Sequence, residues 1–301
     1  MSIRFDDRVA VVTGGGRGLG RSHAISLAAL GARVVVNDTG AGLDGHGTED
    51  SVAEAVVTEI REAGGEAVAD FHDVSTHAGG QGVIDTAVDA YGTIDILVNN
   101  AGYLRDRTFT KMPLDDFDAI IAIHLAGNAY PTHAAWPIMR DKQYGRVVFT
   151  TSAAGLYGNF GQTNYAAGKL AVVGMMNTLV IEGAPKGIRV NTIAPVATTR
   201  MTESLMGDDV ALYDPSLVSP AVVFLCSEEC EASGAIVEAG GGYYSLVQMV
   251  EGAGVVLSAS EATPDAIAEN WGAITDMSVA APYPGAAEAT ARIAGLLRDG
   301  G

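Results

Sequence analysis

The sequence has few cysteines and no long apolar run. Its two cysteines, Cys226 and Cys230, lie four residues apart, and no second Cys or His pair completes a zinc site with them. We therefore expect no metal site and interpret both as reduced structural residues. No run of 18 or more apolar residues occurs, which argues against a membrane-spanning helix.

Basic residues are also scarce. Lys and Arg together number 18, against 36 Asp and Glu, and the formal net charge at pH 7 is -18. Such a charge argues against binding to nucleic acid or anionic membranes, so we expect neither as a partner. The amino terminus lacks the basic region and cleavage site of a signal peptide, and the carboxyl end "LLRDGG" differs from a Ser-Lys-Leu peroxisomal address. These features predict a cytoplasmic protein.

What the sequence does contain is a regular alternation of apolar runs and helix-like stretches. With 301 residues, 48% of them hydrophobic, the chain can bury one sizeable core. Seven runs are continuously apolar, which is typical of parallel strands covered on both faces. They are "RVAVVTG", "ARVVVND", "EAVADFHDV", "DILVNNAG", "GRVVFTTS", "IRVNTIAP" and "GAIVEAGG". With helical stretches at 18–30, 51–63, 77–91, 115–140 and 162–184, they predict an α/β fold with a doubly wound, seven-stranded parallel sheet.

The strand pattern ends after "GGGYY" at 240–244, and two short helical segments follow. We therefore expect a catalytic domain at 1–245 and a helical extension at 246–301 packed on the same domain. A glycine-rich insertion, "TGAGLDGHGTED", lies between Asp38 and Ser51. We expect it to be a mobile loop that ends at a capping box formed by Ser51 and Glu54.

A glycine-rich turn follows the first strand. In "VVTGGGRGLG", Gly14, Gly18 and Gly20 permit a tight turn, and the next helix begins where its amino terminus can receive a pyrophosphate. Asp38 ends the second strand 18 residues after Gly20, where an acid can bind a ribose 2'-hydroxyl. Because a carboxylate repels a 2'-phosphate, the pattern favours NAD over NADP, although Arg17 in the turn could attract that phosphate.

Two further strands end in polar or small residues. Asp73 and Val74 end the third strand, and "NNAG" at 99–102 ends the fourth. Ligands of open α/β sheets bind at the carboxyl ends of strands, so these residues are candidates for cofactor contacts. "NNAG" is equally compatible with a plain turn.

The segment "GNFGQTNYAAGKL" places Tyr165 and Lys169 four residues apart, on one face of a helix. A lysine ammonium beside a phenol favours the phenolate, so we expect Lys169 to lower the pKa of Tyr165 and make it an acid or base near neutral pH. Taken alone, the pair is also compatible with an ordinary surface helix.

Taken together, these motifs resemble the short-chain dehydrogenase/reductase family, with its Rossmann-type fold. The matching elements, in order, are "TGGGRGLG", Asp38, "NNAG", "TTSAAG", "YAAGK" and "NTIAP". Ser152 stands 13 residues before Tyr165, as the family serine does. The resemblance implies that Ser152 hydrogen-bonds the substrate oxygen, Tyr165 exchanges its proton, and Lys169 holds the nicotinamide ribose.

One position departs from the general family pattern. His124 stands where most members have the asparagine of a catalytic tetrad, whose backbone carbonyl holds a water leading to the lysine. The resemblance allows His124 to keep this relay as a catalytic residue. A buried structural histidine is the alternative.

A closer resemblance, from about Arg4 to the end, is to the (3R)-hydroxyacyl-CoA dehydrogenase unit of peroxisomal multifunctional enzyme type 2, without its hydratase and sterol-carrier portions. It rests on "NDTGAG", "LRDRTF", "HLAG", "AAGLYGNFGQTNYAAGKL", "NTIAPVATTRMT" and "FLCSEECEASGAIVEAGGG". It implies that (3R)-hydroxyacyl-CoA is oxidised to 3-ketoacyl-CoA with NAD, by a homodimer or homotetramer. Arg105 and Arg107 are candidate contacts for the anionic phosphates of such a thioester, or a solvated or salt-bridged pair.

Two other functions remain open from the sequence. One is a dehydrogenase for a 17β-hydroxysteroid or another bulky alcohol, which the apolar stretch after "NTIAP" would also suit. That stretch contains Met201, Leu205, Met206, Leu212 and Tyr213, which are equally compatible with lid packing. The other, of a different class, is a non-catalytic NAD-sensing protein built on the same fold.

The resemblance also extends the set of cofactor contacts along the chain. The catalytic candidates are Ser152, Tyr165, Lys169 and His124. The cofactor candidates are Thr13, Gly14, Arg17, Gly18, Leu19, Gly20, Asp38, Asp73, Val74, Asn100, Ala101, Gly102, Tyr165, Lys169, Pro195, Ala197, Thr198, Thr199 and Arg200.

Overall fold

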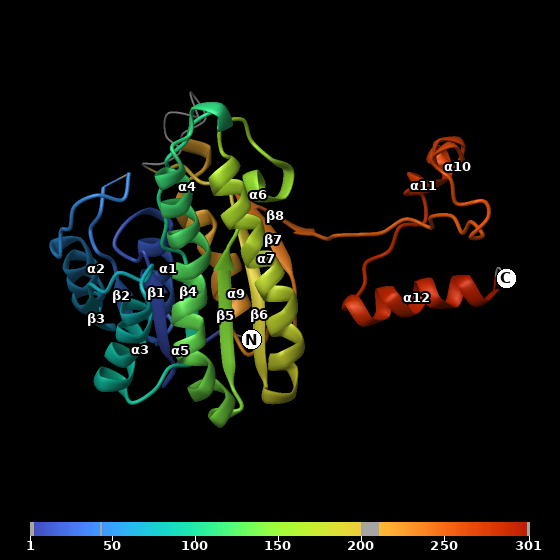
Figure 1. The fold of residues 1–301 in the computed structure, drawn as a ribbon. Coiled ribbons are helices and arrows are strands. Elements are labelled where there is room, and N and C mark those ends of the chain that lie inside the picture. The colour runs from blue at the N-terminus through green and yellow to red at the C-terminus, as the bar shows by residue number, and fades with distance from the viewer. Residues whose placement is uncertain (1–2, 43, 200–210, 300–301) are drawn as a thin grey trace. The chain divides into compact units, whose positions relative to one another are not determined.

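A computed structural model of the chain describes residues 3–42, 44–199 and 211–299, and its centre is one eight-stranded sheet (Figure 1). The strand order is β3-β2-β1-β4-β5-β6-β7-β8, and every pairing from β3 to β7 is parallel. The strands are β1 (Val9–Thr13), β2 (Arg33–Asn37), β3 (Glu66–Asp70), β4 (Ile96–Asn99), β5 (Gly145–Thr150), β6 (Ile188–Pro195), β7 (Ile236–Gly240) and β8 (Tyr243–Val247). The predicted doubly wound α/β fold is confirmed.

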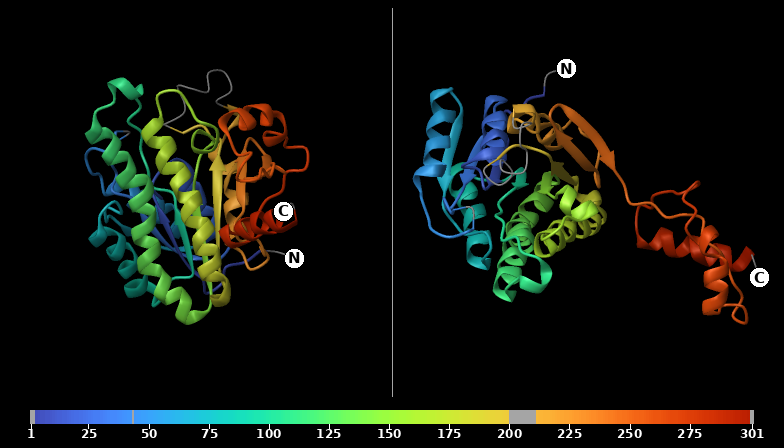
Figure 2. Two further views of the ribbon diagram at one scale, coloured as in Figure 1. Left: turned by 45° about the vertical axis from the view of Figure 1, so that its right-hand side comes forward. Right: turned by 90° about the horizontal axis from the view of Figure 1, so that it is seen from above.

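Helices cover both faces of this sheet (Figure 2). On one face, α1 contacts α2 and α9; on the other, α3 contacts α5, and α7 contacts α4. The helices of the first unit are α1 (Gly18–Ala29), α2 (Ser51–Glu62), α3 (His77–Tyr91), α4 (Leu114–Ile121), α5 (Gly127–Lys142), α6 (Ala153–Tyr157), α7 (Thr163–Gly183) and α9 (Ser219–Cys226). Short 3-10 turns are η1 (Phe109–Lys111), η3 (Ala184–Lys186) and η5 (Pro215–Leu217), and η2 (Ala122–Ala126) is a π-helical segment.

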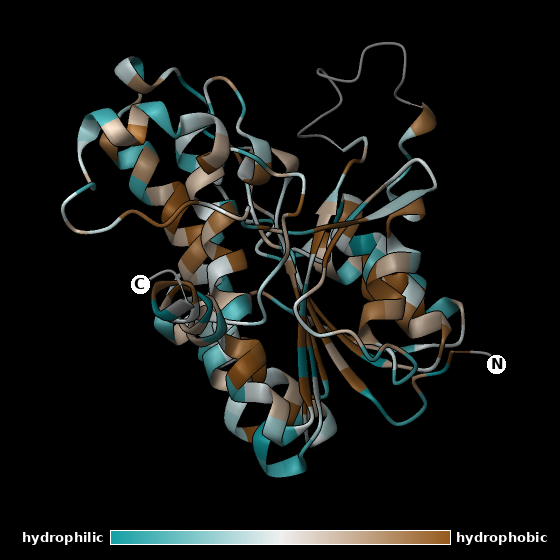
Figure 3. Ribbon diagram, turned by 90° about the vertical axis from the view of Figure 1, so that its right-hand side faces the viewer, coloured by the Kyte–Doolittle hydropathy of each residue, from teal (hydrophilic) through white to brown (hydrophobic). Residues whose placement is uncertain are grey.

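The central strands are buried along their whole length. All residues of β1, β4 and β5 are buried. Figure 3 shows that the strands between the helices are mainly hydrophobic. A parallel strand covered by helices on both faces has no solvent side, so its sequence needs no polar alternation. This explains why continuous apolar runs predicted the strands correctly.

Three local features differ from the sequence-based expectation. The sheet has an additional strand, β8, whose Tyr243 and Tyr244 are exposed, so it lacks the continuous apolar run of a buried strand. The helix expected at 115–140 is divided by η2 into α4 and α5. The expected capping box is wrong: Ser51 Oγ donates to Glu49 Oε1 (2.9 Å), and α2 starts after Asp50 without a side-chain cap.

The chain divides into two compact units, Met1–Leu246 and Val247–Gly301. The second unit contains α10 (Pro264–Glu269), α11 (Trp271–Ile274) and α12 (Ala286–Asp299). Its internal contacts include a backbone bridge between Glu251 and Ala281 and an ion pair between Arg292 and Glu251 (3.1 Å). Packing of this extension on the catalytic unit stays a prediction. Among the described residues, no helix has the length and apolar character that a membrane crossing requires.

A buried histidine links the two helices α1 and α9. His23 Nδ1 lies 2.8 Å from Ser219 Oγ, which also hydrogen-bonds Ser22 Oγ (2.7 Å). His23 is fully buried, and this burial lowers its pKa from 6.5 to about 3. The folded protein therefore keeps His23 neutral at pH values where the unfolded chain binds a proton.

This difference predicts an acid-sensitive fold. Above pH 6.5 His23 is neutral in both states and has no effect, whereas stability is lost as the pH falls from 6.5 towards about 3. At pH 5 the loss from this one group is about 2 kcal/mol. We expect His23→Gln, which keeps a polar partner for Ser219, to lose less unfolding free energy than the wild type between pH 7 and pH 5, measured by urea denaturation. Parallel losses in both proteins would contradict this.

Candidate active site

A cavity of about 450 Å³ opens at the carboxyl ends of the strands. Successive strands are added to one side of β1 as far as β3 and to its other side from β4 onward, and such a switch point is where open α/β sheets bind ligands. The structure brings most of the predicted site residues into its lining. They are Gly14, Arg17, Gly18, Leu19, Asp38, Asp73, Val74, Asn100, Ala101, Gly102, His124, Ser152, Tyr165, Lys169, Pro195, Ala197 and Thr199.

The remaining predicted residues fall into two groups. Thr13, Gly20 and Thr198 are described but do not line the cavity. Arg200 lies outside the described residues, as do Met201, Leu205 and Met206 of the apolar stretch. Sequence reasoning did not assign several lining residues to the site: Thr39, Ala41, Gly42, Gly45, Gly47, Thr48, His72, Ser75, Tyr103, Ile123 and Thr150. The motifs "NDTGAG" and "TTSAAG" contain four of them and could have indicated them: Thr39, Ala41, Gly42 and Thr150.

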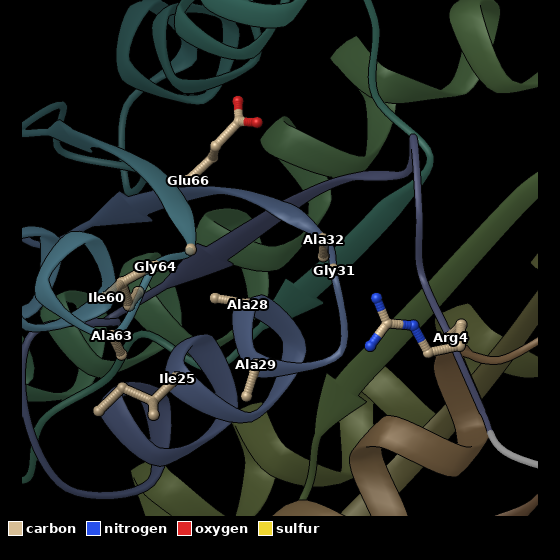
Figure 4. Close-up of a pocket in the computed structure, with 11 residues that line it drawn as sticks. Arg4, Ile25, Ala28, Ala29, Gly31, Ala32, Ile60, Ala63, Gly64 and Glu66 are labelled. Carbon is tan, nitrogen blue, oxygen red and sulfur yellow. The ribbon is translucent and has the colours of Figure 1, made fainter.

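A second cavity, of about 340 Å³, lies between the carboxyl ends of α1 and α2 and the start of β3 (Figure 4). Its walls are mainly alanine and glycine, with Ile25 and Ile60. The charged residues at its rim are Arg4, which pairs with Asp6 (2.7 Å), and Glu66. It contains none of the predicted catalytic residues.

The glycine turn after β1 is shaped by close contacts. Gly14 and Gly18 have φ angles of 63° and 51°, in the left-handed region that glycine adopts without strain. A Cβ atom on Gly20 would lie 2.0 Å from the Gly14 carbonyl oxygen, so α1 can start beside the turn only with glycine there. The Asn100 side chain donates to the Thr13 and Gly14 carbonyls (3.2 Å each), which ties the turn to the end of β4.

Asp38 is fixed at the end of β2 by two backbone donors. Its Oδ2 accepts from the Gly16 amide (2.9 Å) and its Oδ1 from the Gly40 amide (2.8 Å). Arg17 pairs with Glu49 (2.9 Å) and donates to the Ala41 carbonyl. The turn, its helix and this fixed carboxylate fit the pyrophosphate and ribose of a nicotinamide dinucleotide, with Asp38 on the ribose side.

Three of the catalytic candidates lie at the N-cap of α6 and in the first turns of α7. Ser152 is the N-cap residue of α6, and its Oγ accepts from the Ala154 amide (3.1 Å). Lys169 is buried, and its Nζ donates to the Thr150 carbonyl (2.7 Å) while lying 5.7 Å from the centre of the Tyr165 ring. The structure therefore places the serine, the tyrosine and the lysine around one end of the cavity.

The expectation that Lys169 brings the pKa of Tyr165 down towards neutral pH is wrong for this structure. Burial raises the pKa of Tyr165 to about 12, and the charge of Asp106 adds to the rise, while the Ser152 hydroxyl opposes it. Burial also lowers the pKa of Lys169 to about 7, so the ammonium is only partly charged at neutral pH. For both groups desolvation by burial is the largest cause of the pKa shift. It outweighs the attraction between ammonium and phenolate that the i, i+4 spacing led us to expect.

His124 packs against the tyrosine from η2. Its ring meets the Tyr165 ring edge-to-face, with centroids 4.9 Å apart, and its Nε2 lies 2.8 Å from the Tyr103 carbonyl oxygen. The ring fits because two neighbours are glycines: a Cβ on Gly102 would lie 2.2 Å from the imidazole, and one on Gly168 2.9 Å from the His124 Cβ. Burial, followed by the charge of Lys169, lowers the pKa of His124 well below 6.5.

The segment after "NNAG" is tied to the start of α7. Asp106 Oδ2 accepts from Gln162 Nε2 (2.7 Å), and the Arg107 amide donates to the Gly161 carbonyl (2.9 Å). Asn164 Nδ2 donates to the Arg105 carbonyl (3.1 Å). This segment, which follows the cavity-lining residues Gly102 and Tyr103, is therefore positioned by the same turn that precedes Tyr165.

The glycine-rich insertion between Asp38 and Ser51 contacts the same segment through Arg105. The guanidinium donates to the Asp44 carbonyl (2.9 Å), meets His46 Nε2 (3.2 Å) and pairs with Asp116 (3.2 Å). Gly45 lies against the Tyr103 ring, where a Cβ would come within 2.5 Å. Arg105 is therefore salt-bridged, as one of its two sequence readings expected, and its contact with a thioester's phosphates stays a prediction.

The predicted absence of a metal site was based on cysteine spacing. Across residues 3–42, 44–199 and 211–299, no group of three or more His, Cys, Asp or Glu side chains is arranged to hold a metal ion. Cys226 and Cys230 are both buried free thiols, and burial raises the pKa of Cys226.

Comparisons with known proteins agree with this geometry. The family described as short chain dehydrogenase matches residues 8–209. Peroxisomal multifunctional enzyme type 2 of Drosophila melanogaster is 44% identical over 308 residues, covering 99% of this chain and 51% of that protein. Its full-length structure superposes with a TM-score of 0.82 at 39% identity, covering 99% of this chain and 50% of that one. The chain thus spans about half the length of this multifunctional relative.

Two further relatives are shorter proteins. A short-chain type dehydrogenase/reductase of Mycobacterium tuberculosis is 46% identical over 273 residues, covering 90% of this chain and 95% of that protein. The structure of a 7α-hydroxysteroid dehydrogenase, complexed with NADH and 7-oxo glycochenodeoxycholic acid, has a TM-score of 0.71 at 30% identity. That match covers 79% of this chain and 95% of the other.

The contacts of Arg105 predict a local effect on the insertion. Because Arg105→Met removes the contacts with the Asp44 carbonyl and His46 Nε2, we expect the amides of 44–50 to exchange about five- to tenfold faster in hydrogen-exchange mass spectrometry. Arg107→Met is the matched control, because Arg107 is exposed and its guanidinium bonds the carbonyl of its neighbour Asp106. Equal exchange in the two variants would show that Arg105 does not hold the insertion.

Proposed function

Because the chain belongs to the short-chain dehydrogenase family, we propose that it oxidises (3R)-hydroxyacyl-CoA to 3-ketoacyl-CoA with NAD. It is an oxidoreductase that acts on CH–OH groups of a small-molecule substrate with a nicotinamide cofactor. The observation that supports the reaction is that Ser152, Tyr165 and Lys169 line one cavity with the glycine turn. The similarity to peroxisomal multifunctional enzyme type 2 over 99% of the chain supports the substrate class.

The chain's own residues account for the proton in this reaction. Ser152 hydrogen-bonds the substrate oxygen, and Tyr165 takes the hydroxyl proton in its phenolate form as the carbon–oxygen double bond forms. Burial opposes this form in the free protein, whereas the positive charges of Lys169 and of an oxidised nicotinamide would favour it. When bound at the glycine turn, a nicotinamide would supply the acceptor for the hydride of the carbinol carbon. Lys169, held by the Thr150 carbonyl, binds the nicotinamide ribose close to Tyr165.

The preference for NAD rests on the charges near the ribose. Asp38 lines the cavity, with its carboxylate fixed by two backbone amides. Arg17, the cation that could attract a 2'-phosphate, is already paired with Glu49. A 2'-phosphate would therefore meet a fixed negative charge and no unpaired arginine from the turn.

A hydroxysteroid is the second candidate substrate. The 7α-hydroxysteroid dehydrogenase that binds an oxidised bile acid shares the fold and 30% identity, although it matches less of this chain. A hydroxyacyl-CoA is favoured because the matching region in the multifunctional enzyme is longer and more similar. A homodimer or homotetramer and a cytoplasmic location belong to the same proposal; the relative named above is peroxisomal.

The proposal predicts a strict preference for one epimer and one cofactor. Since a fixed serine, tyrosine and nicotinamide meet the hydroxyl and the hydrogen together in one handedness, we expect kcat/KM for the (3R) epimer to exceed that for (3S) by about 10²-fold or more. NADH or NADPH formation is followed at 340 nm with both epimers, with NAD and with NADP, and with a 17β-hydroxysteroid.

Assays with each epimer and each cofactor, and with the steroid, test the substrate and the cofactor separately. Equal rates with both epimers, or activity confined to the steroid, would contradict the substrate. Faster turnover with NADP would contradict the role of Asp38 while leaving the reaction in place.

A further inference from the structure

The glycine-rich insertion after β2 forms an arm, residues 39–42 and 44–50, that is closed at its base. The Glu49 amide donates to the Thr39 carbonyl (3.0 Å), so the two ends of the arm lie side by side. Arg17, from the glycine turn after β1, pairs with Glu49 (2.9 Å). The base of the arm is therefore fixed beside the turn that fits a pyrophosphate.

The arm is also hydrogen-bonded at its tip. The Gly42 amide donates to the His46 carbonyl (2.8 Å), and the Gly45 amide donates to the Gly42 carbonyl (3.1 Å). Gly45 and Gly47 have φ angles of 82° and 80°, which glycine adopts without strain. The arm therefore has a defined shape between its base and its tip.

The tip contacts the segment that follows β4. Gly45 lies against the Tyr103 ring, where a Cβ atom would come within 2.5 Å. The Arg105 guanidinium donates to the Asp44 carbonyl (2.9 Å). Since a guanidinium can only donate, His46 Nε2 accepts its second bond, at 3.2 Å. One ring contact and two hydrogen bonds thus join the tip of the arm to this segment.

The strand order places the glycine turn between the two joined segments. β1 lies between β2 and β4 in the sheet, and the glycine turn follows β1 at the same edge. An arm that starts after β2 and contacts the segment after β4 must therefore reach past the end of β1. Both the arm and the turn line the large cavity, the arm with Thr39, Ala41, Gly42, Gly45, Gly47 and Thr48, and the turn with Gly14, Arg17, Gly18 and Leu19. They border the space in which a pyrophosphate and its ribose would lie.

We propose that the arm closes over the bound dinucleotide, and that its contact with Tyr103 and Arg105 is a latch that opens each time the cofactor enters or leaves. The latch consists of protein groups alone, so it closes the empty site as well as the occupied one. A weaker latch therefore speeds both entry and release and leaves the affinity nearly unchanged. The inference rests on the dinucleotide part of the proposed function and is independent of the substrate.

Arg105→Met tests the latch, because it removes both hydrogen bonds to the tip and keeps a long side chain. NADH binding to the free protein is followed by stopped-flow fluorescence, and its release by displacement with excess NAD. We expect the association and dissociation rate constants each to rise about five- to tenfold, the effect of about one net hydrogen bond. The dissociation constant should change less than about threefold, since neither bond involves the cofactor.

Arg107→Met is the matched control for this substitution. Arg107 lies in the same segment, but its guanidinium donates to the Asp106 carbonyl, and none of its hydrogen bonds reaches the described residues of the arm. Both NADH rate constants of this variant should stay within about twofold of the wild type.

Two glycine substitutions test the latch from the side of the arm. Gly45→Ala and Gly47→Ala strain the backbone alike, because both φ angles are near +80°. The added Cβ meets the Tyr103 ring at Gly45, whereas at Gly47 it has no atom of the described chain within 4 Å. Gly45→Ala should therefore raise both rate constants as Arg105→Met does, and Gly47→Ala should raise them less than about twofold.

Three results would overturn the latch. They are unchanged rate constants in Arg105→Met, equal effects of the two glycine substitutions, and a rise in dissociation alone. In the last case the arm would hold only the bound cofactor and would leave the empty site open. A protein that binds neither NADH nor NADPH would contradict the proposed cofactor and, with it, the role of the arm.

Discussion

The hydrogen bond from Lys169 Nζ to the Thr150 carbonyl fixes the geometry on which the site depends. It joins the first turns of α7 to the last residue of β5, and a second bond, from Thr151 Oγ1 to the Lys169 carbonyl (2.5 Å), reinforces it. Ser152 follows two residues after Thr150, and Tyr165 lies one helical turn before Lys169. One strand end therefore positions the substrate-binding hydroxyl, the proton-transfer group and the cation together. The glycine turn and Asp38 reach the same edge from β1 and β2, because parallel strands all end there.

Burial controls the charges in this site more than pairing does. It raises the pKa of Tyr165 to about 12 and lowers that of Lys169 to about 7, and it keeps His124 neutral. A dry site strengthens every remaining interaction, so small displacements of donors and acceptors have large effects on proton transfer. This explains why so many bonds outside the reacting groups, such as Gln162 to Asp106, hold the walls in place.

The sequence predicted those parts of the structure that depend on local spacing. Buried strands show as continuous apolar runs, and the distance from Gly20 to Asp38 is set by one helix and one strand. By contrast, β8 is an exposed edge strand and has no such run. The π-helical segment that places His124 leaves no trace in apolar periodicity. The pKa of Tyr165 was mispredicted because desolvation depends on residues distant in sequence, as does the contact between Arg105 and His46, which are 59 positions apart.

The most direct test of the account is the substitution Tyr165→Phe, which removes the transferable proton and leaves the glycine turn and Asp38 unchanged. Turnover with the best alcohol substrate and NAD binding to the free protein are measured on the same preparation. The account predicts that kcat falls by about 10²- to 10⁴-fold, the contribution of a general acid or base, while the dissociation constant for NAD stays the same. A loss of less than tenfold would contradict it, because another group would then carry the proton.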